Sequence, residues 1–127
     1  MTINDINANL VNSISLKALP IKNVWEVQTG ATFENGKPFS IFLSLEGDKW
    51  QLTDKKETLK YMNEVYDLKS SDVKNCIASV LKVYGFNIHS GELFCELKSE
   101  NDIPKKIYDF IICIGQLANM YAFFDKP

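Results

Sequence analysis

The sequence predicts an α+β fold in which an antiparallel sheet of about five strands packs against helices. Three consecutive runs alternate apolar and polar residues with the period of a strand: 23–29, 39–45 and 50–52. Three later runs place apolar residues three and four positions apart, as a helix requires: 54–66, 71–84 and 102–124. Because the strands follow one another directly, we expect an antiparallel sheet rather than a doubly wound parallel one. The expected order is α-βββ-αα-ββ-α, in a single domain over residues 1–127.

Length and composition are those of an ordinary soluble domain. The chain has 127 residues, of which 46% are hydrophobic and 24% charged, enough for one domain with its own core. Its formal charge of −2 and its scattered lysines lack the basic excess of a phosphate-backbone binder, so we do not expect a nucleic-acid partner. No signal peptide is visible, and polar residues interrupt the apolar C-terminal run. We therefore expect a cytoplasmic protein without a membrane span.

The first third of the chain contains a helix and a hairpin. Apolar residues three and four positions apart predict a short amphipathic N-terminal helix: Ile3, Ile6, Leu10 and Ile14. Leu19-Pro20 closes this segment, and the first strand follows. Asn35-Gly36 is a strong signal for a tight hairpin between the first two strands. Trp50 and Leu52 are expected to face inward on the third.

The middle of the chain is predicted to contain two helices and two further strands. Asp54 can cap the first helix while Glu57 reaches back to it, the reciprocal arrangement of a capping box. The next helix spans 71–84 and ends at Gly85. Short strands are expected near 86–88 and over 93–97.

The last helix, 102–124, is expected to be the central core helix because its apolar residues occupy more than one stripe. We expect it to cross the sheet with its small residues at the point of close approach: Gly115, Ala118 and Ala122. The opposite flank stays as a candidate contact for a second subunit or another protein: Ile112, Asn119 and Phe123. Asp102-Ile103-Pro104 marks its start.

Strand alternation places Phe42 and Phe94 on the outward face of the sheet, which should otherwise be solvated. Two outward aromatic residues indicate a surface contact, so both are candidate partner-binding residues. Glu92 and Glu96 share this face, and Glu26 can join them across the sheet. Such carboxylates can hold Mg²⁺ or do acid–base work, which leaves a small metal-assisted hydrolase as an alternative. We favour the simpler explanation, an exposed sheet face that carries ordinary charges.

Other signals of catalysis are weak, and we predict no catalytic residue, metal or cofactor. His89 is the single histidine and lies in a predicted turn beside Ser90, without the elbow and orienting carboxylate that a Ser-His system needs. No phosphate-binding or dinucleotide-binding glycine pattern is present. Three cysteines have no metal or redox spacing and are expected to be buried apolar residues: Cys76, Cys95 and Cys113.

The run 50–59, Trp-Gln-Leu-Thr-Asp-Lys-Lys-Glu-Thr-Leu, resembles the signature of a bacterial and phage family, domain of unknown function 1828. That signature is a strand ending in Thr-Asp, two turn residues, a polar residue, then Thr and Leu. Similar features fall at 25–29, 81–86 and Leu93, so the resemblance covers roughly residues 23–117. Lys55-Lys56 stand where the family often has an acidic residue and glycine, and Gly30 where it often has proline. The resemblance implies a companion of phage or mobile elements and transfers no catalytic residue.

The predicted order of helices and strands is also similar to that of the dimeric chaperones of type III secretion, an analogy of architecture alone. We therefore expect a non-catalytic protein that acts by binding a protein partner, with a chaperone-like homodimer as an alternative.

Overall fold

The computed structural model describes residues 3–8, 10 and 14–120. The helices there are α1 (Ile3–Ala8), α2 (Glu57–Val65), α3 (Ser71–Tyr84) and α4 (Ile103–Ala118), with a 3₁₀ turn, η1, at Glu100–Asp102. The strands are β1 (Ser15–Ala18), β2 (Val24–Gln28), β3 (Phe42–Glu46), β4 (Lys49–Thr53), β5 (Asn87–His89) and β6 (Glu92–Leu97). They form one antiparallel sheet in the order β1-β2-β3-β4-β6-β5. The predicted α+β class is confirmed.

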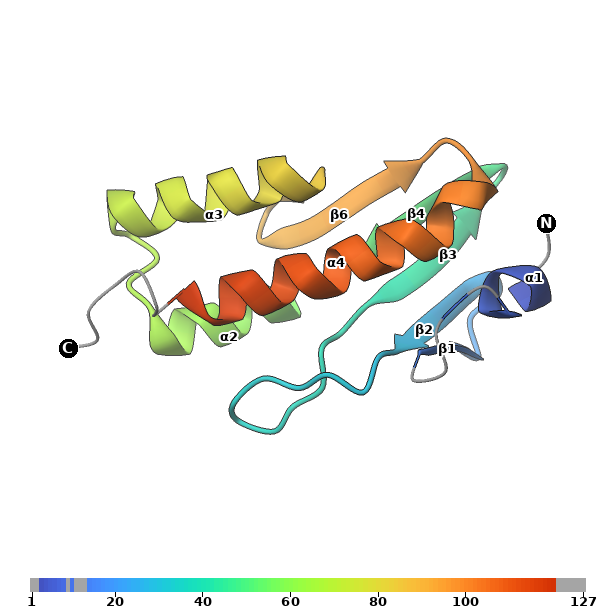
Figure 1. Cartoon of the computed structure of the whole chain (residues 1–127), viewed down its shortest axis with the longest axis horizontal. Helices are drawn as coiled ribbons and strands as arrows, with labels where there is room; N and C mark the ends of the chain where they lie inside the picture. Colours follow the sequence, from blue (N-terminus) through green and yellow to red (C-terminus); the bar gives the residue numbers. More distant parts are fainter. Residues whose placement is uncertain (1–2, 9, 11–13, 121–127) are drawn as a thin grey trace.

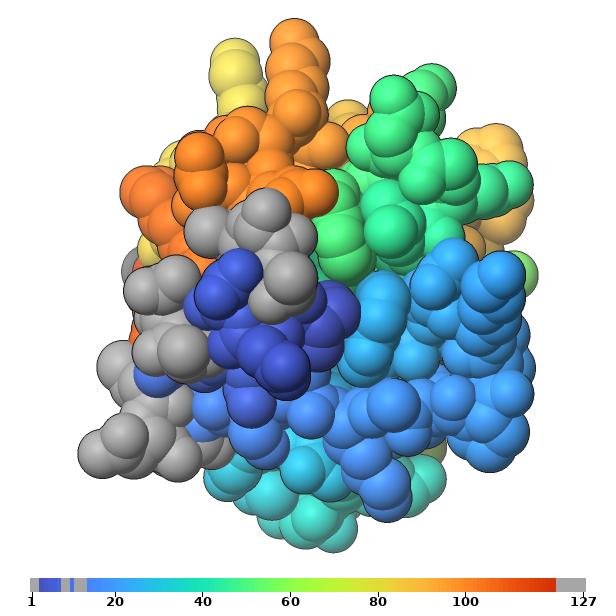
Figure 2. Space-filling view, turned by 90° about the vertical axis from the view of Figure 1, so that its right-hand side faces the viewer, coloured from blue at the N-terminus to red at the C-terminus, as the bar shows by residue number. Residues whose placement is uncertain are grey.

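The described helices gather on one side of the sheet. α4 crosses the sheet with its first turns and continues past the strand ends, where α2 and α3 lie beside it (Figure 1). Seen from the end of the molecule, α1 packs next to the segment that leads into α4, and the strands lie to the other side (Figure 2). Within the described residues, no helix has both the length and the apolar character needed to cross a bilayer.

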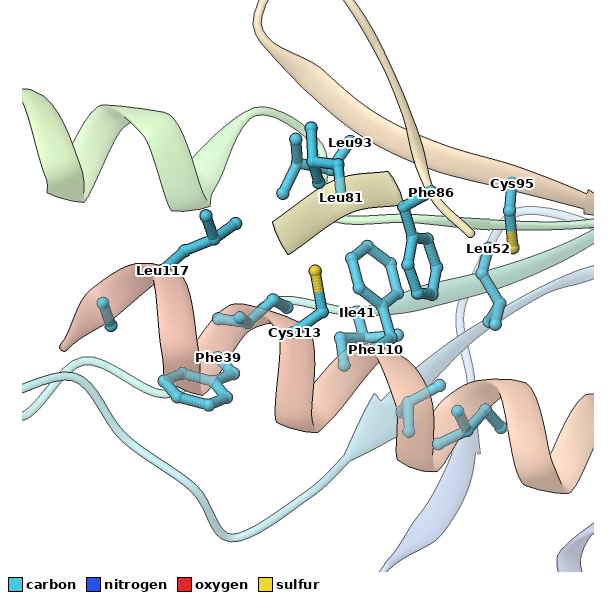
Figure 3. Close-up of a cluster of buried hydrophobic side chains, with 14 of the residues drawn as sticks. Phe39, Ile41, Leu52, Leu81, Phe86, Leu93, Cys95, Phe110, Cys113 and Leu117 are labelled. Atoms are coloured by element: carbon cyan, nitrogen blue, oxygen red, sulfur yellow. The ribbon is translucent and has the colours of Figure 1, made fainter. Parts of the chain in front are cut away.

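The core forms between α4 and the inward face of the sheet. One register row contributes inward side chains from four strands: Trp25, Leu43, Leu52 and Cys95. α4 covers them with side chains that are 0% exposed: Ile107, Phe110, Cys113, Ile114 and Leu117. Figure 3 shows Phe110 beside Phe86 within this cluster, and the two rings stack with centroids 4.2 Å apart. The inward side chains, which recur every second residue on the strands and every three or four residues on α4, therefore form one buried layer.

The sheet has six strands instead of about five, because residues expected at the end of the first helix form β1. α1 ends at Ala8, and the Leu16 N–H donates to the Asn7 side chain. Asparagine is a poor helix former that favours such local hydrogen bonds, so the helix stops early. β1 then pairs with β2 in register.

The Asn35-Gly36 turn forms as predicted, but the flanking strands do not extend up to it. Gly36 has a φ of 86°, and the Asn35 side chain accepts from the Lys37 N–H. Only an isolated bridge joins Thr32 to Pro38, and β3 begins at Phe42 rather than at residue 39. Phe33 instead stacks on Tyr61 of α2 with ring centroids 4.3 Å apart. Apolar packing against α2 thus pulls the hairpin end out of the sheet.

The close approach expected at the small residues of α4 is wrong for Gly115. A Cβ atom added there would meet nothing within 4 Å. Ala118 is buried, and its carbonyl accepts from the Tyr66 hydroxyl, while Ala122 lies outside the described residues. The helix has room at Gly115 because this residue lies on the same side of α4 as Ile112 and Asn119, which are both exposed.

Candidate functional site

The polar centre of the molecule is Asp54, which follows β4 and is 0% exposed. Its Oδ1 accepts from the backbone N–H groups of Lys56 and Leu93, both at 3.0 Å, and its Oδ2 accepts from the N–H of Thr58 at 3.2 Å. The Asp54 N–H in turn donates to the Leu93 carbonyl at 3.1 Å. One side chain therefore joins the end of β4, the start of α2 and the strand β6.

This arrangement corrects the predicted capping box in one respect. The Asp54 side chain does accept from the first turn of α2. Its backbone N–H, however, donates to the Leu93 carbonyl, whereas the capping box predicted that the Glu57 side chain would accept from it. Burial raises the pKa of Asp54 above its ordinary value, against the hydrogen bonds from Thr58, Leu93 and Lys56, which lower it. Since the backbone donors occupy both carboxyl oxygens, the group is a structural junction rather than an accessible acid or base.

The turn between Asp54 and α2 uses two lysines in the left-handed region. Lys55 has a φ of 53° and Lys56 a φ of 71°. Only in this conformation does the Lys56 N–H turn back toward the Asp54 carboxyl, and a side chain other than glycine makes the conformation costly.

Thr53 precedes Asp54 and faces the opposite side of the sheet. Its hydroxyl accepts from the Lys55 N–H and donates to the Glu92 carboxylate on β6. Thr53 pairs across the strands with Phe42 on one side and Phe94 on the other. The predicted outward aromatics therefore lie in one row with Thr53 between them, both half-buried.

We call the outward surface of β2, β3, β4 and β6 the open face, because no described helix lies on it. Besides the row of Phe42, Thr53 and Phe94, it presents four carboxylates: Glu26, Glu46, Glu92 and Glu96. A hollow of about 280 Å³ lies beside Glu26 and Phe42. A second hollow, of about 350 Å³, lies at the other end among Ser44, Glu46, Lys49, Gln51 and Glu96.

The three carboxylates proposed for metal chemistry do not converge. Glu26 belongs to β2 and Glu92 and Glu96 to β6, three strands away and thus about 14 Å apart at the usual strand spacing. Glu92 accepts from Thr53 instead. In the part of the chain that the structure describes, no group of three His, Cys, Asp or Glu side chains could hold a metal ion.

The candidate contact on α4 is only partly described. Ile112 is 49% exposed, which matches its predicted outward position. Asn119 is exposed, but its amide donates to the Gly115 carbonyl and ends the helix. Phe123 lies outside the described residues. Of this set, Ile112 alone presents an exposed apolar side chain.

His89 lies in a strand rather than in the predicted turn, and Cys76 is less buried than predicted, whereas Cys95 and Cys113 are buried as expected. His89 is exposed at the end of β5, and Ser90 follows in the turn with a φ of 50°. Cys76 is half-buried, while Cys95 and Cys113 are buried. Burial raises the pKa of the Cys95 thiol to about 11 and that of Cys113 to about 12, so both are protonated at neutral pH.

A smaller hollow of about 170 Å³ lies between the hairpin end and α2. Its walls carry two lysines and two glutamates beside the ring of Tyr61: Lys37, Lys60, Glu57 and Glu64. This volume is below the range of about 300–1,000 Å³ typical of small-molecule sites. The balanced charge on its walls selects no ligand class.

A family model described as domain of unknown function DUF1828 matches residues 29–116. The chain belongs to this family. No curated protein and no solved structure matches it. The matched span contains run 50–59, on which the resemblance rests, and with it the Asp54 junction, Phe42 and Phe94.

Replacing Asp54 by asparagine should lower the free energy of unfolding by about 1–3 kcal/mol, because the amide nitrogen cannot accept from the Thr58 N–H. A protonated Asp54 carboxyl still has an oxygen at Oδ2 that can accept from the Thr58 N–H, so the asparagine amide is not equivalent to the protonated acid. Urea denaturation at pH 7 measures the loss. Asp67→Asn is the matched control, since Asp67 is exposed and should change stability by about 0.5 kcal/mol or less.

The difference in free energy of unfolding between wild type and Asp54→Asn should depend on pH in a defined direction. Because the folded-state pKa of Asp54 is raised, its stabilising contribution is complete below the ordinary value of 3.8 and is lost as pH rises through the folded-state pKa. Wild type should therefore exceed Asp54→Asn by more near pH 4 than near pH 7. Equal stability of the two proteins, or a gap that widens with rising pH, would contradict the assigned geometry.

Lys56→Gly should raise the free energy of unfolding by about 0.5–1 kcal/mol, because glycine adopts the left-handed conformation without a Cβ penalty. Lys60→Gly makes the same chemical change inside α2 and should lower stability by about 1 kcal/mol. Thermal unfolding monitored by circular dichroism compares the two. Changes of the same sign would show that the turn is not strained.

Proposed function

We propose that this protein is a non-catalytic interaction protein, of phage or mobile-element type, that binds a protein partner in the cytoplasm. The observation that carries the proposal is the placement of Phe42 and Phe94 in one row on the open face. Aromatic residues are enriched at protein interfaces and dominate their energetics when a partner covers them. A half-buried ring on an uncovered sheet is well placed for that role.

The construction of the open face supports binding through it. Its residues lie on four hydrogen-bonded strands, so little backbone order has to be gained when a partner docks. Below the row, Asp54 ties β4 to β6 and holds Thr53 between the two aromatic rings. The face is therefore presented as a preformed surface.

The positions of the acidic groups favour binding over catalysis. Backbone N–H groups occupy the carboxyl of Asp54, and the three glutamates proposed for metal chemistry are spread across the sheet. General acid–base chemistry requires a carboxyl within hydrogen-bond reach of a substrate, which a buried, saturated group does not offer.

A second candidate is a homodimer of the kind formed by type III secretion chaperones. It rests on Ile112, which is 49% exposed on α4, on the helical side of the molecule. Such a dimer would use the opposite side of the molecule from the open face. One set of variants can therefore separate the two candidates.

The test is affinity capture from cells of the native host with the tagged full chain, comparing wild type, the pair Phe42→Ala and Phe94→Ala, and Ile112→Asp. We expect the Phe variant to lose a specific captured protein by at least about tenfold, because truncating interface aromatics costs more than about 1–2 kcal/mol. Ile112→Asp is the control and should retain it. Light scattering of each variant gives its mass in solution.

The proposal fails if the Phe variant, shown to be folded by circular dichroism, captures the same proteins as wild type. A dimeric wild type that becomes monomeric on Ile112→Asp would favour the chaperone-like homodimer instead.

A further inference from the structure

The charges on the open face narrow the class of partner. Resting on the proposed function, we infer that the open face docks a basic–apolar–basic segment of a partner protein, with two Arg or Lys side chains about 15 Å apart on either side of apolar residues. The apolar residues of this segment would cover the row of Phe42, Thr53 and Phe94.

Carboxylates surround the aromatic row. Glu26 pairs directly with Phe42 across β2 and β3, and Glu92 and Glu96 flank Phe94 along β6. The same face carries two lysines on its strands, each opposite a glutamate: Lys17 pairs with Glu26 across β1 and β2, and Lys49 pairs with Glu46 across β3 and β4. Four glutamates against two lysines leave the face net acidic as well as aromatic, and the register places no lysine opposite Glu92 or Glu96.

Two hollows adjoin the row and suit a long cationic side chain: one lies at its Phe42 end, and the other lies beside it, further along β3, β4 and β6. The first lies between the Glu26 carboxylate and the Phe42 ring, so a guanidinium there would meet both an opposite charge and an aromatic surface. The second is lined by two carboxylates, Glu46 and Glu96, against one lysine, Lys49, so its walls are net acidic. Both have room for a long side chain such as that of arginine.

Strand geometry sets the spacing between the two hollows. Glu26 and Glu96 lie three strands apart, about 14 Å, and their register rows are offset by two residues along the strand, about 7 Å. The diagonal is roughly 16 Å. In an extended segment, side chains four positions apart on one face are about 13 Å apart, and the length of arginine covers the difference.

The same charges argue against the other occupants of this face. A second copy docked face to face would oppose two net acidic faces, each with four glutamates against two lysines, and like net charges across an interface cost binding energy. A nucleic acid would bring its phosphates to the same carboxylates. A partner with an acidic surface meets the same objection.

The test uses a fluorescent peptide of about ten residues with two arginines four positions apart, valine between them and threonine elsewhere. Its control peptide has glutamate in place of both arginines. Fluorescence anisotropy with the full chain should show that only the arginine peptide binds, and that binding weakens as salt rises from about 50 to 200 mM. Binding should weaken about tenfold with Glu26→Gln plus Glu96→Gln.

The matched control is Glu64→Gln plus Asp72→Asn, which removes the same charge from exposed positions on α2 and α3. It should leave the affinity within about twofold of wild type. Failure of the arginine peptide to bind at about 1 mM, equal binding of both peptides, or equal losses in the two charge variants would each overturn the inference.

These outcomes are separate from those of the proposed function. If Phe42→Ala plus Phe94→Ala still abolishes capture of the cellular partner while Glu26→Gln plus Glu96→Gln does not, the open face binds a protein that is not recognised by basic groups. If the Phe variant changes nothing, the proposed function itself fails.

Discussion

The hydrogen bonds to the Asp54 carboxyl are the interaction on which the rest of the structure depends. A buried carboxyl is costly unless donors satisfy it, and here three backbone N–H groups do so. Those donors come from a turn, a helix start and a strand 39 residues away in sequence. Satisfying this one carboxyl therefore fixes how β4, α2 and β6 are placed relative to one another.

The neighbour of Asp54 links this junction to the surface. Because strand side chains alternate, fixing Asp54 beneath the sheet end places Thr53 on the open face, where its hydroxyl joins Glu92. The two Phe residues then lie on either side of it. The family signature, run 50–59, thus contributes Thr53 to the proposed binding surface and Asp54 to the junction beneath it. The two aromatic residues of that surface come from β3 and β6, outside the signature.

Patterns local in sequence predicted local structure well. The period of two put Phe42 and Phe94 outward, and the helical period with Gly85 gave α3 its correct bounds. The sequence indicated that Asp54 caps α2. It could not indicate the hydrogen bonds between Asp54 and Leu93, because the pairing of β4 with β6 decides which distant N–H lies beside the carboxyl. The separation of Glu26 from Glu92 and Glu96 has the same cause, since strand order is a tertiary property.

The remaining differences are places where packing overrides local preference. The hairpin end of the 29–41 segment leaves the sheet because Phe33 stacks on Tyr61 of α2. Residues 15–18 form β1 because they pair with the edge of β2. Gly115 was expected at a close approach, yet it lies on the exposed side of α4 with Ile112 and Asn119. Small residues at helical spacing do not by themselves say which side of a helix faces the sheet.

Native-state hydrogen exchange tests the central claim most directly. If the Asp54 carboxyl holds the three elements together, the amides of Lys56, Thr58 and Leu93 should exchange only when the whole domain unfolds, at a rate matching the amide of Leu52 in β4. This is a demanding expectation for Lys56, whose side chain is exposed. Exchange of any of the three amides orders of magnitude faster than that of Leu52 would show that the junction opens locally, and would contradict the account.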